Sequence, residues 1–520
     1  MRVASRIAFI YPSTYQAMIT SLATDLIYYY INNREEVYLE RFYAKKLLGE
    51  EEYPRSIETR SPLKDFDLLI SSLSYEFDIV NLISILEAGG IDPLREKRDK
   101  PLIAGGPVVI SNPVPYRDLV DVFIIGEVEA TIDKIIDLWV ENRDNKKRFL
   151  EEAADLEYVY IPDLKEEAER RFVEDLNNSY YPTKQIENLL IEPVYGRGVK
   201  LEMSRGCLFW CSFCIESRLF QPYRERSFAT LRNILEKSLE NTISGKRVVI
   251  YSLLLPSSRD QIRFLEYLAN ENFKASIPSL RLDKLYYYRS DFLDIIKRLG
   301  QRTLTIAPET FSLKIQRIYM KYMFQEDLLI KYIEEFIKSG FDVKMYLIYG
   351  SKWEDMSDIK SNIEAIKRLH RFARNMGRRI VVSLNPLIPK ARTIFQWIGL
   401  REPEELKKIL DLYERELRGI IDTRPLDIMW GVAQAYISLS NRSLGEIFIE
   451  WSRRGRSINQ LIKLLSSRLD PGLHKIVREG YRYGDELPWD KIVIGSNVEK
   501  IVENQYRALI ELMSRSRISS

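Results

Sequence analysis

All three cysteines of this 520-residue chain lie in one short loop, at Cys207, Cys211 and Cys214. Cysteines scattered independently would cluster this tightly with a probability on the order of one in a thousand, so the clustering points to a shared chemical role. Their spacing lets three thiolates from one loop converge on one soft metal centre, and a cubane of four irons held by three cysteines leaves one iron free. An open iron can bind a substrate or a cofactor. We therefore predict that these cysteines are metal ligands and catalytic residues.

Three simpler roles for the cysteines compete with a metal cluster. A structural zinc site needs a fourth ligand, and the two histidines, His370 and His474, lie far away in the sequence. A disulfide would leave an odd thiol, and a long chain with so few cysteines does not look built for an oxidising compartment. Three unrelated buried thiols would not be expected to cluster. The neighbouring Phe209, Trp210 and Phe213 either pack in a core or shield a cluster from water, which serves the same chemistry.

The composition is that of a large protein with balanced charge. Lysine and arginine number 78 and aspartate and glutamate 75, so the net charge of +3 neither requires nor excludes a nucleic-acid partner. The length predicts about three domains with sizeable cores. Residues 1–20 show no signal peptide, and no stretch reaches the length of a membrane span. We therefore expect a cytoplasmic protein without a membrane partner, whose substrate is RNA, a protein or a small molecule.

The first 145 residues alternate short apolar strands with helices. This alternation predicts a doubly wound, Rossmann-like α/β domain over residues 1–145, with about five parallel strands near residues 6–11, 37–42, 67–73, 101–104 and 122–125. Ligands of such sheets bind at the carboxyl ends of the strands. The candidate binding residues there are Ser13, Thr14, Gly105, Gly106 and Gly126. Glycine and serine also form ordinary turns, and this alternative stays open.

A second alternating region follows a charged stretch, residues 146–195, that we interpret as a helical linker. Residues 196–400 predict a partial (β/α)6 barrel of the TIM type, with strands near 199–203, 247–253, 274–280, 303–307, 343–348 and 380–384. Chemistry in such barrels sits at the carboxyl ends of the strands, and the cysteine loop directly follows the first strand. Residues 401–520 predict a mainly helical C-terminal domain.

The carboxyl ends of the other barrel strands carry polar residues and a glycine. Arg281 can form charge-assisted hydrogen bonds to a carboxylate, and Glu309 can accept a hydrogen bond from a hydroxyl or an ammonium group. Polar residues at strand ends are also routine caps and turns, so the structural role remains an alternative for each. The candidate cofactor-binding residues of the barrel are Phe213, Ser252, Arg281, Glu309, Tyr349, Gly350 and Asn385.

The cysteine motif, including the aromatic Phe213 before the last cysteine, resembles the cluster motif of the radical S-adenosylmethionine (SAM) superfamily. Further stretches look like the group usually named cobalamin-binding-domain radical SAM proteins. They are YPSTY at residues 11–15, IAGGP at 103–107, IGE at 125–127, YRERS at 223–227, SLRLD at 279–283, GQRTLTIAPET at 300–310, PKARTIFQW at 389–397 and LPWD at 487–490. The resemblance therefore spans nearly the whole chain.

This resemblance implies a 4Fe-4S cluster whose free iron chelates SAM, and an external reductant of the flavodoxin or ferredoxin type. An electron from the cluster would cleave SAM to a 5′-deoxyadenosyl radical. Arg281 and Glu309 then sit where polar contacts to SAM are expected. A cobalamin-dependent methylation of an unactivated carbon is the activity that the group's N-terminal domain suggests. A methylthiotransferase acting on tRNA or ribosomal protein would need a second cluster, for which the chain has no spare cysteine. A non-enzymatic iron-sulfur binding or scaffold protein is the third alternative.

Two departures from the family pattern bear on the cofactors. The strand near residues 247–253 lacks the Gly-Gly-Glu that usually meets the SAM amino group, so this contact stays unassigned. The N-terminal domain lacks the Asp-x-His-x-x-Gly motif and contains no histidine. Any cobalamin bound there would have no histidine ligand from this domain. The alternative is that the domain has kept its fold and lost the cofactor, or binds part of the substrate instead.

Overall fold

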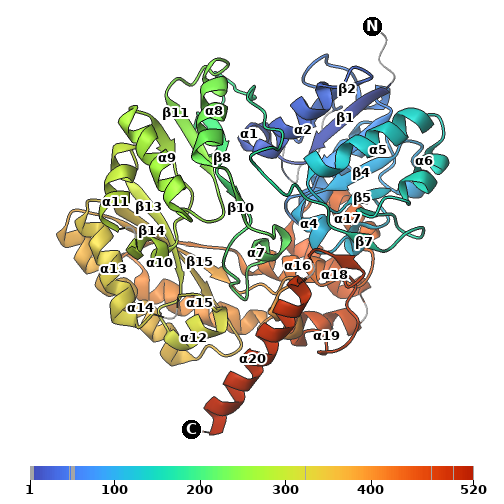
Figure 1. Ribbon diagram of the computed structural model, residues 1–520. Coiled ribbons are helices and arrows are strands. Elements are labelled where there is room, and N and C mark those ends of the chain that lie inside the picture. Colours follow the sequence, from blue (N-terminus) through green and yellow to red (C-terminus); the bar gives the residue numbers. More distant parts are fainter. Residues whose placement is uncertain are drawn as a thin grey trace.

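The computed structural model describes residues 5–45, 47, 53–287, 289–322, 324–469, 471–495 and 497–518. In Figure 1 the N-terminal domain, in blue and cyan, lies beside a second α/β region in green and yellow, and the C-terminal helices, in orange and red, pack below both. No helix among these residues is long and apolar enough to cross a membrane.

The N-terminal domain contains a six-stranded sheet in the order β2-β1-β3-β4-β5-β6. The strands are β1 (Ser5–Tyr11), β2 (Val37–Tyr43), β3 (Leu68–Ser72), β4 (Leu102–Gly105), β5 (Val122–Ile124) and β6 (Val159–Tyr160). The first five strands are parallel, and β6 pairs antiparallel to β5. The predicted doubly wound sheet is therefore confirmed. The strand order reverses between β1 and β3, which is where sheets of this type bind ligands.

Side chains of β1 alternate between the two helical layers of this domain. Ile7 and Phe9 pack with the layer that contains α2 and α5, whereas Ala8 and Ile10 pack with α3 and α4. The helices are α1 (Tyr15–Thr20), α2 (Leu22–Asn32), α3 (Asp78–Ala88), α4 (Pro107–Ser111), α5 (Val128–Asn142) and α6 (Lys146–Ala153). Both faces of the sheet are covered, which explains why its central strands consist mainly of apolar residues.

The second region is an open barrel of parallel strands. One sheet contains β8 (Val199–Glu202), β11 (Arg247–Tyr251) and β12 (Lys274–Ser276), and the other contains β13 (Thr303–Glu309), β14 (Asp342–Tyr349), β15 (Ile380–Pro386) and β16 (Asp422–Pro425). A parallel bridge between Leu280 and Ile306 links the two sheets. All six predicted strands are present. The seventh, β16, was not predicted, because its sequence DTRP is polar and contains a proline at an edge position.

Helices surround this barrel on its outside. They are α8 (Phe228–Leu239), α9 (Arg259–Asn270), α10 (Leu282–Tyr287), α11 (Arg289–Arg298), α12 (Leu313–Tyr319), α13 (Glu326–Lys338), α14 (Met356–Asn375) and α15 (Pro403–Leu417). In β14 the side chains of Val343, Met345 and Leu347 are buried against this layer. The intervening Lys344 and Tyr346 point to the opposite side, the lumen of the barrel, because side chains alternate along a strand.

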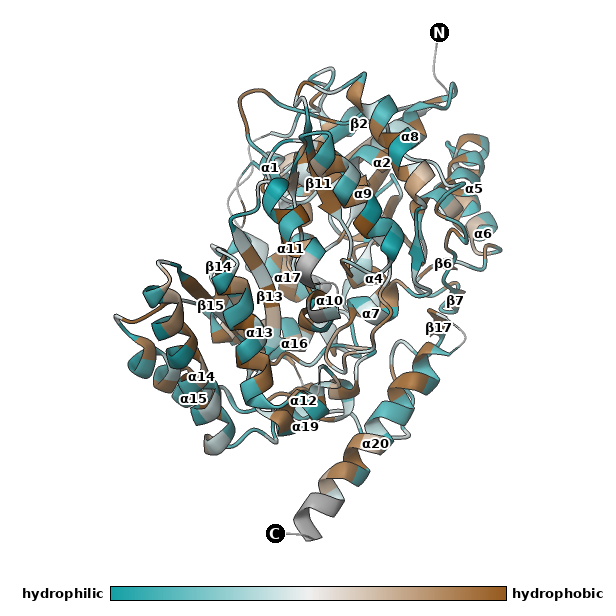
Figure 2. Ribbon diagram, turned by 60° about the vertical axis from the view of Figure 1, so that its left-hand side comes forward, coloured by the Kyte–Doolittle hydropathy of each residue, from teal (hydrophilic) through white to brown (hydrophobic). Residues whose placement is uncertain are grey.

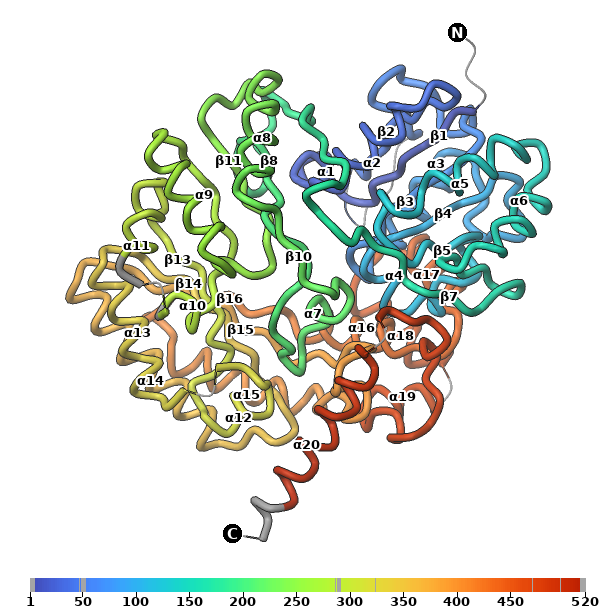
Figure 3. The backbone as a smooth tube through the Cα atoms, in the orientation of Figure 1, coloured from blue at the N-terminus to red at the C-terminus, as the bar shows by residue number. Residues whose placement is uncertain are grey.

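The predicted helical linker over residues 146–195 is wrong beyond α6. After this helix only β6 and the short β7 (Ala168–Glu169) are regular, and Figure 3 shows the chain after β7 crossing from the N-terminal domain to β8 of the barrel. Charge misled the prediction, since Arg170 is not on a solvated helical face but is buried against Glu127.

The C-terminal region contains five further helices and one short strand. They are α16 (Ile428–Ser438), α17 (Gly445–Arg453), α18 (Ile458–Arg468), α19 (Pro471–Glu479), α20 (Val498–Ile518) and β17 (Ile492–Val493), which pairs with β7. Helix α20 projects from the body of the protein in Figures 1 and 2. Its first half packs beside the short helix η4 (Ile394–Trp397), and Gln505 in this half reaches the cysteine loop.

Candidate functional site

The cysteine loop runs from β9 (Ser204–Arg205) to α7 (Glu216–Leu219), at the carboxyl end of β8. Gly206 begins it with φ of 85°, and a Cβ there would lie 2.4 Å from the carbonyl oxygen of Phe220. The three cysteines are free thiols, of which Cys211 is buried. Burial raises the pKa of Cys207, and it raises the pKa of Cys214 to about 11. A bound metal would offset this cost, because metals bind the deprotonated thiolate.

The three thiols do not gather as the ligands of one ion would. Among the described residues no group of three or more histidine, cysteine, aspartate or glutamate side chains is close enough to hold one metal ion. In an iron-sulfur cubane each cysteine binds a different iron, so its thiolates stand farther apart than the ligands of one zinc. The chemistry of the donor set, three cysteine thiols on one loop, fits a cluster with one thiolate for each of three irons.

Arg218, which the sequence analysis missed, holds the loop from inside. Its side chain is fully buried, and Nη1 donates to the carbonyl oxygens of Cys211, at 2.7 Å, and of Cys214. Nη2 donates to Oε1 of Gln505 in α20 at 2.7 Å, and Nε2 of Gln505 donates to the carbonyl oxygen of Trp210 at 2.6 Å. The C-terminal helix thus contacts the loop directly. Proximity in sequence could have indicated Arg218, but nothing in the sequence indicates Gln505.

The aromatic residue before the last cysteine packs beneath the loop. The ring of Phe213 meets that of Tyr319 edge-on, with centroids 5.3 Å apart. Ser212 is fixed to the same segment, since its amide donates to the carbonyl oxygen of Tyr319 and its hydroxyl to that of Ile318. These contacts give Phe213 a packing role that positions the loop.

Arg281 and Glu309 both lie beside the cysteine loop. Nη1 of Arg281 is 3.4 Å from Sγ of Cys211, and its guanidinium lies 3.5 Å from the ring centroid of Phe209. Glu309 has φ of 64°, and its Oε1 accepts a hydrogen bond from Nζ of Lys321 at 2.7 Å. Burial alone would lower the pKa of Lys321, but the carboxylate of Glu309 raises this pKa above its usual value. Two cations therefore stand near the thiols, and Lys321 was not among the predicted residues.

The other barrel candidates divide between the lumen and the helical layer. Asn385 pairs with Ile348 in register and so faces the lumen, whereas Tyr349 faces outward and packs 6.1 Å from the ring of Tyr413. Gly350 is part of a turn, in which its amide donates to Glu354. The alternation of side chains along β14 directs Tyr349 away from the lumen, and Gly350 follows the end of this strand, so neither residue lines the cavity described next.

A cavity of about 820 Å³ lies between the N-terminal sheet and the barrel. Its wall includes Ser71, Gly105, Gly106 and Gly126 at the carboxyl ends of the N-terminal strands and apolar residues of α2. On the barrel side it includes Glu202, Tyr251, Ser252, Ser276, Thr305, Lys344 and Tyr346. Four of the predicted residues, Gly105, Gly106, Gly126 and Ser252, therefore line one cavity. The cavity touches both sheets at once, which is the position at which a ligand could bridge the two domains.

The three glycines of this wall differ in what a side chain would meet. A Cβ on Gly105 would have no atom within 4 Å, so this residue leaves space open to the cavity. Gly106 has φ of 115°, and its Cβ would lie 2.4 Å from the carbonyl oxygen of Leu73. A Cβ on Gly126 would lie 2.5 Å from the carbonyl oxygen of Arg171. Gly105 shapes the cavity, whereas Gly106 and Gly126 permit close approach of the backbone.

Ser13 and Thr14 do not line this cavity. The hydroxyl of Thr14 caps α1 by accepting from the amide of Ala17 at 3.3 Å, and the carbonyl oxygen of Ser13 accepts from the amide of Ala44. The turn that follows β1 is therefore a helix start, the ordinary role for serine and threonine at this position. Cofactor binding by these two residues stays a prediction.

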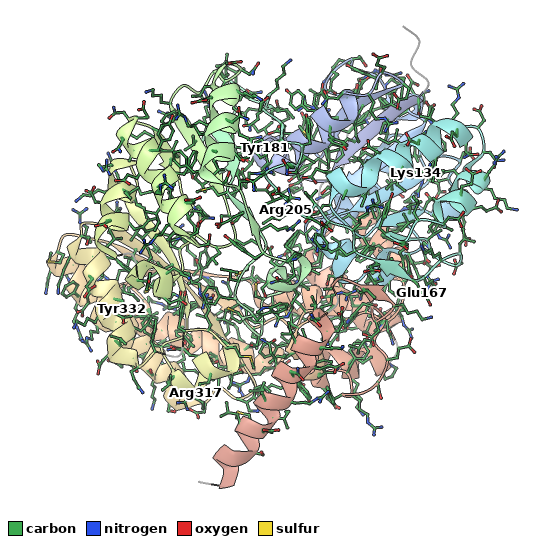
Figure 4. The ribbon with its side chains drawn as sticks, in the orientation of Figure 1. Lys134, Glu167, Tyr181, Arg205, Arg317 and Tyr332 are labelled. Carbon is green, nitrogen blue, oxygen red and sulfur yellow. The ribbon has the colours of Figure 1, made fainter. Side chains whose placement is uncertain are left out.

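A buried ion network joins the N-terminal domain to the cysteine loop. Arg205, two residues before Cys207, donates to Glu127 at 2.6 Å, to Glu129 at 3.0 Å and to Glu202 at 2.9 Å. Figure 4 labels Arg205 at the meeting of the two domains. Burial would raise the pKa of Glu127, but its hydrogen bonds and the surrounding positive charges lower it to about 2. The other arginines of the network are Arg170, Arg224 and Arg226.

The stretch at residues 389–397 forms a second junction between domains. Arg392 is buried, and its guanidinium donates to the carbonyl oxygens of Ser111 in the N-terminal domain and of Trp489 and Ile492 in the C-terminal region. Lys390 pairs with Glu76 of the N-terminal domain. These motif residues hold three parts of the chain together rather than line the cavity.

Comparisons with known proteins agree with this architecture. The family model for the N-terminal domain of radical SAM proteins matches residues 23–162. The family model of the radical SAM superfamily matches residues 201–366. The uncharacterized protein MJ0966 of Methanocaldococcus jannaschii is 27% identical over 502 residues, which cover 95% of this chain and 100% of that protein.

Two solved structures share the fold over nearly the whole chain. The radical SAM methyltransferase TsrM from Kitasatospora setae, solved with cobalamin and a 4Fe-4S cluster, matches with a TM-score of 0.51 and 11% identity, covering 98% of this chain and 100% of its own. The cobalamin-dependent SAM radical enzyme OxsB, solved with aqua-cobalamin, matches with a TM-score of 0.50 and 12% identity, covering 99% of this chain and 80% of its own. At these identities the likeness shows the fold alone. The two family models together match more than half of the chain, which shows that this protein is an enzyme of the radical SAM superfamily.

Proposed function

We propose that this enzyme cleaves SAM reductively at a 4Fe-4S cluster and methylates an unactivated carbon with the help of cobalamin. The observation that carries the proposal is one cavity that touches the carboxyl ends of strands in the N-terminal sheet and of strands in the barrel. When bound, the cluster supplies the electron that splits SAM to a 5′-deoxyadenosyl radical, and cobalamin supplies the methyl group. The residues of the chain bind these groups and keep water away from them.

The cluster would be held by Cys207, Cys211 and Cys214, with Arg218 as a positioning residue. Arg281 and Lys321 place positive charge beside the thiols, which favours their deprotonated form. Arg281 is the residue that we assign to the carboxylate of SAM, since a guanidinium binds a carboxylate with two parallel hydrogen bonds. Glu309 is assigned to a ribose hydroxyl or to the SAM ammonium group.

Electrons would enter through the exposed edge of the loop. Leu208 is 51% exposed although it directly follows a cluster ligand. We infer that an external reductant of the flavodoxin or ferredoxin type approaches at this edge. A methylthiotransferase activity is disfavoured, because all three cysteines belong to this loop and a second cluster would have no thiolate.

Cobalamin would bind at the N-terminal side of the cavity. The wall there consists of small residues, Ser71, Ser72 and Gly105, opposite apolar side chains such as Leu22 and Leu26. The space left open by Gly105 fits a large flat ligand against the strand ends. This wall contains no histidine. We therefore propose that the cobalt receives no imidazole from the protein.

Anaerobic reconstitution with iron, sulfide and hydroxocobalamin tests the proposal. We expect about four irons and stoichiometric cobalt in the purified protein, and release of 5′-deoxyadenosine from SAM after reduction with dithionite. The variant Gly105→Leu should retain iron and SAM cleavage but lose cobalt, since its side chain fills the cavity. Gly105→Ala is the matched control and should retain both.

The outcomes separate the two halves of the proposal. Iron and SAM cleavage without cobalt in the unmodified protein would refute the cobalamin assignment and leave a radical SAM enzyme whose N-terminal domain serves another purpose. Equal cobalt binding by the Gly105→Leu variant would refute the placement of cobalamin against β4.

A further inference from the structure

One lysine lies in the lumen of the barrel without an acidic partner. Lys344 is the third residue of β14, faces the lumen and lines the cavity. Its neighbour in register on β13 is Thr305, which also lines the cavity. Nζ of Lys344 lies 4.9 Å from the ring centroid of Tyr346, two residues further along the same face. Among the described residues, the ammonium group of Lys344 has this cation–π contact with Tyr346, and no carboxylate forms an ion pair with it.

Three carboxylates of the same cavity wall, and one on the same strand as Lys344, already pair with arginines. Glu127, Glu129 and Glu202 of the cavity wall all bind Arg205. Asp342, which faces the lumen from the same strand, accepts a hydrogen bond from the amide of Arg379 at 2.9 Å and lies 3.8 Å from its guanidinium. Glu216 lines the cavity too, but it follows the cysteine loop in α7 and forms no ion pair with Lys344. The lysine is therefore a cation that the protein itself leaves without a counter-charge.

A partly buried ammonium group on the wall of a cavity can bind an anionic group of a ligand through charge-assisted hydrogen bonds. Thr305 and Tyr346 lie beside Lys344, Ser276 lines the same cavity, and the hydroxyls of all three can donate hydrogen bonds to an anion. Apolar residues such as Ile277, Val249 and Leu253 surround them. This surrounding fits an anionic group carried by an otherwise apolar molecule.

The position of Lys344 separates this anion from SAM. Five residues of β14 follow it before the strand ends at Tyr349, which corresponds to roughly 16 Å along the strand. The cysteine loop lies at the carboxyl ends of the strands, so SAM chelated there keeps its own carboxylate near Arg281. We propose that Lys344 binds a carboxylate or phosphate group of the substrate, whose apolar part extends through the lumen toward the cluster. The assignment of this anion to the substrate rests on the proposed function.

Binding of matched probes tests this site without turnover. Octanoate, octyl phosphate and octanol have apolar chains of closely similar length, with about seven or eight carbons, and differ in the head group. Their affinities for the full chain with its reconstituted cluster can be compared by isothermal titration calorimetry. We expect the better anion to bind the unmodified protein roughly tenfold or more tightly than octanol. The comparison of octanoate with octyl phosphate identifies the anion.

Three variants make the test specific. Lys344→Met should abolish the preference for the anion and leave octanol binding unchanged, and Lys344→Arg should restore the preference. Lys360→Met, which removes an exposed lysine on α14, is the matched control and should bind all three probes like the unmodified protein. Equal binding of anions and octanol by the unmodified protein, or a preference for anions that survives in a folded Lys344→Met variant, would overturn the proposal. Neither result depends on cobalt binding or SAM cleavage, so failure of this proposal and failure of the proposed function are distinguishable.

Discussion

Replacement of Arg218 by methionine should release the cluster while the protein stays folded. The guanidinium is fully buried and donates to the carbonyl oxygens of Cys211 and Cys214. Burial lowers the pKa of Arg218 to about 10, so the side chain remains charged at neutral pH. Methionine fills a similar volume but donates no hydrogen bond. The backbone of two cluster ligands would then lose its buried donor.

The size of the effect follows from these hydrogen bonds. A hydrogen bond that involves a charged group contributes about 1.5 to 3 kcal/mol, and a buried acceptor left without a donor costs about 1 to 3 kcal/mol. Because Arg218→Met removes the donor to two buried carbonyl oxygens, we expect the ordered loop to lose about 3 to 5 kcal/mol of stability. Gln505→Leu removes one neighbour of Arg218 and keeps both carbonyl bonds, so its cost should be smaller, about 1 to 2 kcal/mol.

The assay is the anaerobic rate of iron loss to a chelator, measured on reconstituted protein. We expect Arg218→Met to lose iron at least tenfold faster than the unmodified protein, and Gln505→Leu to lie between them. Arg218→Lys keeps the charge but not the planar fork that reaches several carbonyl groups, so it should not restore retention fully. Far-UV circular dichroism shows whether each variant is folded. A folded Arg218→Met variant that retains iron as long as the unmodified protein would refute the reasoning.

Two carboxylates predict opposite pH dependences of stability. The pKa of Glu127 is lowered to about 2 in the folded protein, so its contribution of about 3 kcal/mol is present above the unfolded pKa near 4.5 and is lost as the pH falls toward 2. Glu127→Gln should therefore be less stable in urea by a constant amount above pH 5, and a difference that does not shrink between pH 5 and 3 would contradict this. Burial raises the pKa of Glu354 to about 7, so the protein loses about 3 kcal/mol as the pH rises from 4.5 through 7. Glu354→Gln should raise the melting temperature more at pH 8 than at pH 4, and an equal shift at both would show that the carboxylate does not ionise in the folded state.

The parts of the site that the sequence predicts are those made by neighbouring residues. The three cysteines lie within eight positions, and most strands of the N-terminal sheet and of the barrel are short apolar runs between turn signals. Local patterns of this kind need no knowledge of the fold. Strand β16 escaped prediction because its polar sequence is a strand only through pairing with β15. Tyr349 was misplaced by one residue of register, which is enough to turn a side chain from the lumen to the helical layer.

The contacts between domains show why the remaining site residues were out of reach. Glu127 binds three arginines that follow it by 43, 78 and 97 positions. No spacing rule connects such residues, and composition made Arg170 look like a solvated charge. The same limit applies to Lys344. The sequence does not show that Glu127, Glu129 and Glu202 of the same cavity wall pair with Arg205, so that this lysine has no ion pair among the described residues. The fold therefore decides which charges pair, although the composition shows only that positive and negative charges nearly balance. Lys344 remains in the cavity without an ion pair among the described residues, and we expect the substrate to be recognised there.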